Sequence, residues 1–321
     1  MRFALVVLLL AACTHGDPVP PRTATPGAGA TTPSASVQLT WRRLADITTP
    51  RSEVAAAVLR GVVYLVGGFG GGNVVETYAA DRWSTAARYP IAVDHAMAAG
   101  VDVVGTPGLY VFGGNVNGVA VARSFRFFGD QGWREIASMP APRSQGAAVA
   151  LGGKVFIVGG AANDRLVAPT YVYDTATDRW NVAASLPTPR DHLAAVEFAG
   201  RLCAIGGRKL SLLQNLASFE CYDPGRDAWL AMPDAPTARG GIGAAVVGNR
   251  IFVVGGEQPL GTFKDVDIFD ATSGKWGRGP DLPTPRHGLG VVAVGGTVYV
   301  MSGGPTPGAS QTAVCEALDV R

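Results

Sequence analysis

The sequence has few of the residues that mark metal centres, nucleic-acid binding or membrane spans. Its 321 residues include four histidines and four cysteines, too few to predict three or four converging metal ligands. The 27 basic and 25 acidic residues give a net charge of +2 without a dense basic run, which argues against a nucleic-acid partner. The apolar run Phe3–Ala12 is ten residues long, whereas a membrane-spanning helix needs roughly 20. We therefore expect no metal, no cofactor and no nucleic acid.

The first 36 residues differ in composition from the rest. Arg2 and the apolar run after it are typical of a signal peptide. The run ends Leu-Ala-Ala-Cys at Cys13, which resembles the cleavage box of bacterial lipoproteins. We expect residues 1–12 to be removed, Cys13 to carry a lipid, and residues 13–36, rich in Thr, Pro, Ala and Gly, to form a disordered tether. The alternative is an ordinary secretory signal ending at a chance cysteine. The preferred interpretation predicts an exported protein of the cell envelope, anchored by lipid on the periplasmic or extracellular side.

Glycine, by contrast, is abundant and marks an internal repeat. A Gly-Gly pair follows a β-rich run six times, at steps of 46, 46, 47, 49 and 48 residues. The pairs are Gly67-Gly68, Gly113-Gly114, Gly159-Gly160, Gly206-Gly207, Gly255-Gly256 and Gly303-Gly304. Six tryptophans share the period: Trp41, Trp83, Trp133, Trp180, Trp229 and Trp276. Two independent markers with one period predict six copies of one structural unit.

Each unit contains four short strands bounded by Gly, Pro or Asp, which predicts an antiparallel meander. An aromatic residue precedes the tryptophan by seven positions in the third to fifth units, as in Tyr173 and Trp180. These features resemble the kelch family, which implies an all-β, six-bladed β-propeller over residues 37–321. Trp41 precedes the first Gly-Gly pair, and no tryptophan follows the last. We therefore expect the segment 39–44 to complete the last blade and close the ring.

An arginine stands 16 or 17 residues before five of the six Gly-Gly pairs. First strands line the axis of a propeller, so we expect a channel mouth rimmed by guanidinium groups, which suit carboxylate ligands. In the second unit Asp94 is assigned to the arginine's place. The predicted ligand-binding residues are Arg51, Asp94, His95, Arg143, Arg190, His192, Arg239, Arg286 and His287. The alternative is structural: each arginine pairs with an acid or carbonyl of a neighbouring blade, and the histidines are polar rim residues.

Three features remain open or favour a structural role. Cys203 and Cys221 lie on neighbouring strands of the fourth unit, where they either pair or remain reduced core residues, with Cys315 left over. The repeated aromatic residues are expected in the core between blades. The loops after the Gly-Gly pairs are small and polar, which favours a small anionic ligand over a strong protein-binding surface.

The sequence thus predicts an exported, lipid-anchored and non-catalytic binding or interaction protein. Its partner would be a small anionic or carbohydrate ligand, or an envelope protein. The alternative is an envelope enzyme resembling kelch-type sialic-acid mutarotases, because channel arginines suit a sugar carboxylate, although no catalytic residue is matched by position. A copper enzyme resembling galactose oxidase needs Tyr and His ligands and a Tyr–Cys crosslink, for which histidines are too few. A scaffold in an envelope assembly is a third possibility.

Overall fold

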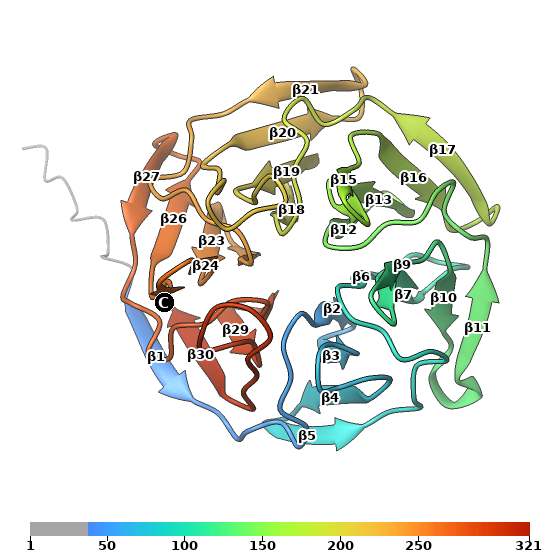
Figure 1. The fold of residues 1–321 in the computed structure, drawn as a ribbon, viewed down its shortest axis with the longest axis horizontal. Coiled ribbons are helices and arrows are strands. Elements are labelled where there is room, and N and C mark those ends of the chain that lie inside the picture. The colour runs from blue at the N-terminus through green and yellow to red at the C-terminus, as the bar shows by residue number, and fades with distance from the viewer. Residues whose placement is uncertain (1–37) are drawn as a thin grey trace, which may run out of the picture. The chain divides into compact units, whose positions relative to one another are not determined.

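The computed structural model describes residues 38–321, so the expected signal peptide, the lipidation site Cys13 and the expected tether lie outside the described residues. Over residues 38–321 the fold is all-β, with six four-stranded antiparallel blades arranged in a ring (Figure 1). This confirms the predicted six-bladed β-propeller. The one helical turn in this range is the 3₁₀ turn η1 (Gly129–Gln131). None of the described residues form a helix with the length and apolar character that a membrane crossing requires.

The strands of each blade follow one another from the axis outward. Blade 1 consists of β2 (Ala55–Leu59), β3 (Val62–Val66), β4 (Val75–Ala79) and β5 (Arg82–Thr85). Blade 2 consists of β6 (Met97–Val101), β7 (Gly108–Phe112), β10 (Ser124–Phe127) and β11 (Trp133–Ile136). Blade 3 consists of β12 (Ala147–Leu151), β13 (Lys154–Val158), β16 (Thr170–Asp174) and β17 (Arg179–Ala183). Blade 4 consists of β18 (Ala194–Phe198), β19 (Arg201–Ile205), β20 (Phe219–Asp223) and β21 (Ala228–Ala231). Blade 5 consists of β22 (Gly243–Val247), β23 (Arg250–Val254), β26 (Val266–Asp270) and β27 (Lys275–Arg278). Blade 6 consists of β28 (Gly290–Val294), β29 (Thr297–Met301), β30 (Cys315–Val320) and β1 (Leu39–Arg43).

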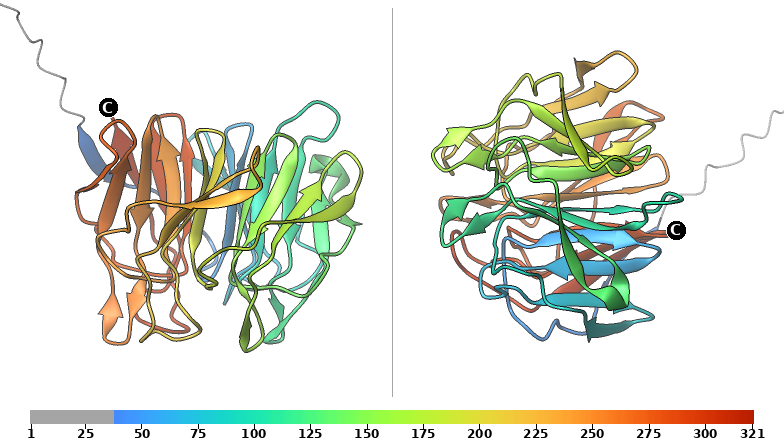
Figure 2. Two further views of the ribbon diagram at one scale, coloured as in Figure 1. Left: turned by 90° about the horizontal axis from the view of Figure 1, so that it is seen from above. Right: turned by 90° about the vertical axis from the view of Figure 1, so that its right-hand side faces the viewer.

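Three short hairpins stand in the loops between second and third strands. They are β8 (Asn115–Val116) with β9 (Val119–Ala120), β14 (Ala161–Ala162) with β15 (Arg165–Leu166), and β24 (Glu257–Gln258) with β25 (Gly261–Thr262). The edge-on views of Figure 2 show these loops on one face of the disc, which we call the mouth face.

The ring closes through β1, which supplies the outer strand of blade 6 as predicted. Its register with β30 runs from Leu39 opposite Val320 to Arg43 opposite Glu316. Figure 1 shows this blue strand beside the red C-terminal strands. The pairing covers the outer edge of β30, which would otherwise present unpaired backbone groups.

The six tryptophans join neighbouring blades. Each indole N–H donates to a carbonyl of the segment that leads into its own blade from the preceding one. The pairs, at 2.7–3.1 Å, are Trp41 with Pro280, Trp83 with Ala45, Trp133 with Ala87, Trp180 with Ala137, Trp229 with Ala184, and Trp276 with Pro233. Their rings pack against buried clusters made from two adjacent blades, such as Phe112 and Tyr173 around Trp180. The repeated aromatics therefore form the contacts between blades.

Candidate binding site at the mouth of the channel

The five repeat arginines do not rim the mouth, which corrects the expectation from the sequence. Arg51, Arg143, Arg190, Arg239 and Arg286 are buried, with at most 1% of each exposed. In Arg286, Nε donates to the carbonyl of Ser302 at 2.7 Å and Nη2 to that of Val300 at 2.9 Å, while Nη1 lies 2.5 Å from Glu316 Oε2. Four blades have such a pair: Arg51–Glu76, Arg190–Glu220, Arg239–Asp267 and Arg286–Glu316. The structural alternative therefore describes these arginines, although the acid belongs to the same blade and not to a neighbour.

Blades 2 and 3 depart from this pairing. Within residues 38–321, no carboxylate pairs with Arg143. Its guanidinium lies 4.1 Å from the centre of the Tyr171 ring, and burial lowers its pKa to about 10. In blade 2 the arginine's place belongs to Val93, whose carbonyl accepts a hydrogen bond from the second glycine of a Gly-Gly pair, as the carbonyls of Arg143, Arg190, Arg239 and Arg286 do. The sequence assignment of Asp94 to that place is wrong by one residue.

Two residues after each repeat arginine, and two residues after Val93 in blade 2, the chain reaches the axis of the propeller. There Glu53, His95, Gln145, His192, Gly241 and Gly288 all adopt positive φ, from 52° to 69°. The backbone N–H of each donates to the carbonyl of the equivalent residue in the preceding blade, at 2.7–3.1 Å. The six hydrogen bonds close a circle, which we call the axial ring.

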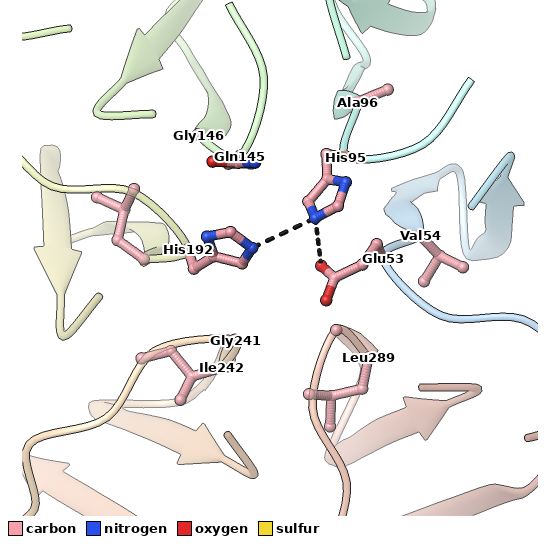
Figure 3. Close-up of a pocket in the computed structure, with 12 residues that line it drawn as sticks. Glu53, Val54, His95, Ala96, Gln145, Gly146, His192, Gly241, Ile242 and Leu289 are labelled. Carbon is pink, nitrogen blue, oxygen red and sulfur yellow. Dashed lines mark hydrogen bonds and ion pairs between the residues drawn. The ribbon is translucent and has the colours of Figure 1, made fainter. Parts of the chain in front are cut away.

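The axial ring carries polar side chains on one side and none on the other. Glu53, His95, Gln145 and His192 line a cavity of about 80 Å³ at the channel entrance. Position 288 favours glycine, because a Cβ there would lie 2.5 Å from Glu53 Oε1 and would collide with that side chain. Figure 3 shows the side chains of Glu53, His95 and His192 directed toward one another across the opening.

These three side chains meet through the Nε2 atom of His95. It lies 3.3 Å from Glu53 Oε2 and 3.3 Å from Nε2 of His192. Behind each imidazole stands an aspartate: His95 Nδ1 is 2.6 Å from Asp94 Oδ1, and His192 Nδ1 is 2.6 Å from Asp191 Oδ2. Because an ionised carboxylate only accepts hydrogen bonds, each Nδ1 carries the hydrogen and each Nε2 faces the axis.

A second group of charges continues from the other oxygen of Glu53. His287 Nδ1 lies 3.1 Å from Glu53 Oε1 and 3.4 Å from Glu257 Oε1, and its Nε2 lies 3.1 Å from the carbonyl of Thr306. All three oxygens are acceptors, which favours the protonated form of His287. Arg208 Nη1 donates to Glu257 at 2.7 Å, and Arg208 Nε is 3.7 Å from Asp191. The network therefore runs from blade to blade around the mouth.

Burial and neighbouring charges shift the pKa values of this group in different directions. Burial raises the pKa of Glu53, but the charges and hydrogen bond of the surrounding histidines lower it overall. Burial lowers the pKa of both axial histidines. For His95, Glu53 and Asp94 outweigh burial and raise the pKa, whereas for His192 burial dominates and the pKa is lowered. For His287, the hydrogen bond and charge of Glu53 and the charge of Glu257 outweigh burial and raise the pKa.

The sign of the mouth differs from the one expected. Four carboxylates surround the opening, those of Glu53, Asp94, Asp191 and Glu257. Arg208 is already paired with two of them, Asp191 and Glu257. A negative, partly desolvated site suits a cation or a hydroxyl-rich ligand better than an anion. The geometry thus removes the basis for the small anionic ligand.

The structure brings together only some of the residues predicted for the mouth. Asp94, His95, His192 and His287 converge there, whereas the five arginines lie inside their blades. Sequence reasoning missed Glu53, Gln145 and Asp191, whereas Arg208 and Glu257 begin two of the loops after the Gly-Gly pairs that were considered for ligand binding. A signal was present for two of these, because Glu53 and Gln145 each follow a repeat arginine by two positions.

The mouth is flanked by small side chains inside the channel and by exposed apolar side chains on the mouth face. Beyond the axial ring the channel is lined by small residues, including Ala55, Ala96, Ala147 and Ala194. On the mouth face, the loops between second and third strands expose large apolar side chains: Val119, Leu210, Leu213 and Leu260. Leu213 and Leu260, on blades 4 and 5, are 83% and 97% exposed.

The three cysteines that the structure describes take no part in the mouth. Cys203 and Cys221 oppose each other on β19 and β20 and form a disulfide, which settles the alternative left open by the sequence. Cys315 is buried in blade 6, and burial raises the pKa of its thiol to about 11. A thiolate at neutral pH is therefore strongly disfavoured at this position.

Ring, repeat and mouth together define a six-bladed β-propeller built on a kelch-like unit. The Kelch motif family matches residues 142–187 and 238–283, which lie largely in blades 3 and 5. The repeated unit around the ring, together with these motifs, supports a kelch-repeat protein.

Similar proteins are found among poxvirus proteins and solved structures. The chain is 26% identical over 148 residues to "Kelch repeat and BTB domain-containing protein 1" of camelpox virus strain CMS, covering 43% of this chain and 25% of that protein. The protein of the same name from horsepox virus is 24% identical with the same coverage. The match thus spans about a quarter of the length of these relatives. The solved structure of YjhT has a TM-score of 0.73 at 17% identity, covering 85% of this chain and 95% of YjhT, and shares the fold.

Proposed function

We propose that the chain is a non-catalytic kelch-repeat binding protein of the cell envelope, which holds its ligand or partner at the mouth. The observation that carries this proposal is the make-up of the axial ring. Gly241 and Gly288 complete the hydrogen-bonded circle without side chains, so the fold itself does not need charged groups at these positions. Glu53, His95 and His192 nevertheless place ionisable groups at equivalent positions, and ionisable clusters in a cleft are typical of functional sites.

A protein partner is supported by the loops of the mouth face. Kelch-repeat propellers commonly mediate protein interactions, and binding residues tend to lie on loops held by a rigid scaffold. Leu213 and Leu260 present apolar side chains to solvent from two adjacent blades beside the mouth. Such exposed apolar groups near a polar site favour a docking surface.

Export and lipid anchoring are supported by two independent features. The apolar run ending at Cys13 lies outside the described residues and predicts a lipoprotein signal. The Cys203–Cys221 disulfide is typical of an oxidising compartment. Gln38 pairs with Arg321, and Val320 bonds to Gly296 in the turn between β28 and β29, on the face opposite the mouth. Attachment upstream of Gln38 would therefore leave the mouth accessible.

The test combines a fractionation and a capture experiment. We expect Cys13→Ser to move the full chain from the membrane fraction to the soluble fraction. We expect the double variant Leu213→Asp/Leu260→Asp to lose a partner that the unaltered chain captures from envelope extracts. Val182→Asp, on the outer strand β17, changes an equally apolar exposed residue away from the mouth and is the matched control. Equal capture by all three proteins would contradict docking on the mouth face.

A carbohydrate-modifying enzyme is supported by one observation. His95 and His192 are in contact, and their pKa values shift in opposite directions, which is how acid and base roles are separated within one site. We would follow the anomerisation of neutral and acidic sugars by NMR. Catalysis abolished by His95→Gln would support this second function, and no acceleration by the unaltered chain would exclude it for the sugars tested.

A further inference from the structure

The distances within the mouth match those between ligands of a single metal ion. One ligand atom from each of Glu53, His95 and His192 can be chosen so that all three lie within 4.8 Å of one another. His95 Nε2 is 3.3 Å from both of its neighbours. Nitrogen and oxygen ligands bind Zn²⁺ at about 2.0–2.1 Å, so two corners of a tetrahedron lie about 3.3 Å apart. Two of the three distances between the ligand atoms thus already match a tetrahedral zinc site, and the third lies within 4.8 Å.

The imidazoles are also oriented as metal ligands are. Asp94 and Asp191 accept the Nδ1 hydrogens at 2.6 Å, which fixes each ring and leaves the Nε2 lone pair directed at the axis. Carboxylates behind histidines serve this purpose at zinc sites. Two lone pairs facing each other at 3.3 Å repel, so either a proton or a cation must lie between them.

The charge of the network favours a cation. Four carboxylates, those of Glu53, Asp94, Asp191 and Glu257, lie around the two axial histidines, and Arg208 pairs with two of them. The axial side chains are largely shielded from water, at 7–9% exposure. Buried negative charge is expensive unless it is paired, and a cation held between these side chains would offset it.

We propose that the mouth holds one divalent transition-metal ion, with Glu53, His95 and His192 as its three protein ligands. Imidazole and carboxylate donors in this ratio suit Zn²⁺ and its neighbours in the transition series and not Mg²⁺ or Ca²⁺, which prefer oxygen. The fourth coordination position faces the cavity of about 80 Å³, where water or a donor group of the partner would bind. This revises the expectation from composition that the protein has no metal site. The inference rests on the proposed function, because it assigns a ligand to the same mouth.

The test is metal binding by the full chain after chelator treatment and dialysis. We expect one equivalent of Zn²⁺ at micromolar free metal, competition by Co²⁺ with the intense visible bands of a tetrahedral complex, and no competition by Mg²⁺. Glu53→Gln, His95→Gln and His192→Gln should each weaken Zn²⁺ binding by more than about 100-fold, because outer-shell changes alone cost about 10–100-fold. Asp191→Asn, behind His192, should fall within that smaller range.

Glu135→Gln is the matched control for Glu53→Gln, since Glu135 lies exposed on the outer strand β11 and does not line the mouth cavity. It should bind Zn²⁺ as the unaltered chain does. Melting curves in chelator establish that each variant is folded. Absence of Zn²⁺ and Co²⁺ binding by the folded, unaltered chain would overturn the proposal and leave a proton between the histidines. One equivalent retained by all three ligand variants would overturn it as well, because the metal would then be bound elsewhere.

The capture experiment, repeated in chelator, separates this inference from the proposed function. A chain that binds no metal and still captures its partner through the mouth face refutes the metal alone. A chain that binds Zn²⁺ at these three residues and captures no partner supports the metal and counts against protein docking.

Discussion

Glu220→Gln tests whether the repeat arginines are structural. Arg190 is fully buried, and its guanidinium donates to the carbonyls of Thr188 and Ala204 and to Glu220. The substitution keeps the shape of the side chain but leaves a buried cation without its counter-charge. Breaking a buried pair costs about 3–5 kcal/mol, and the two remaining carbonyl bonds favour the lower end, about 3 kcal/mol.

The expected change in melting temperature follows from the size of the propeller. At about 2.1 cal/mol/K per residue, residues 38–321 have an unfolding entropy of about 0.6 kcal/mol/K, so 3 kcal/mol corresponds to about 5 °C. Circular dichroism melting measures the shift, and urea unfolding gives the free energy independently.

Blade 2 supplies the control, because Val93 stands in the arginine's place and Phe125 in the acid's. The double variant Arg190→Val/Glu220→Phe copies that apolar pair into blade 4. Replacing both members of a buried pair by apolar residues is often neutral, so the double variant should be more stable than Glu220→Gln. The reasoning is refuted if Glu220→Gln melts within 1 °C of the unaltered chain, or if the double variant is the least stable.

Two further changes test the axial ring and the disulfide. Gly288→Ala should melt several degrees below Gly248→Ala. Both positions have positive φ, but a Cβ at Gly288 would meet Glu53, whereas a Cβ at Gly248 would meet no atom within 4 Å. Equal melting temperatures of the two variants would contradict this steric argument. Cys203→Ser/Cys221→Ser should lower the free energy of unfolding by about 3 kcal/mol, because the disulfide closes a loop with a sequence separation of 18. A reductant should destabilise the unaltered chain alone, and no effect of the reductant in urea unfolding would show that the bond is absent in solution.

The fold was predictable because its markers repeat. Gly67-Gly68 and Trp83 carry little information alone, but six copies at one period determine the number of blades and show which strand closes the ring. The disulfide was only a possibility from the sequence, because it requires Cys203 and Cys221 to stand directly opposite each other on neighbouring strands. The register of those strands depends on the conformation of the loop between them, which the sequence does not reveal.

The mouth was harder to predict because the backbone turns between each repeat arginine and the residue that reaches the axis. Arg190 turns into its blade while His192, two residues later, reaches the axis after a backbone turn with positive φ. The residues next to Arg190 in the sequence predict neither this turn nor the pairing of Arg190 with Glu220, which lies on the third strand of the blade. In the second unit the missing arginine removed the marker, so Asp94 was placed one residue out of phase.

The pairing of β1 with β30 determines when the propeller can be finished. Of the described strands, β1 is synthesised first and waits for a partner about 277 residues later, as in the contact between Arg42 and Asp319. Closing a loop of that length costs roughly 4 kcal/mol more in chain entropy than closing a loop of about four residues. Blades 1 to 5 are local in sequence and can form as the chain emerges, whereas the sixth must wait for its last strand. Until then both ends of the array present open sheet edges, the state in which an unfinished chain is most prone to pair with another.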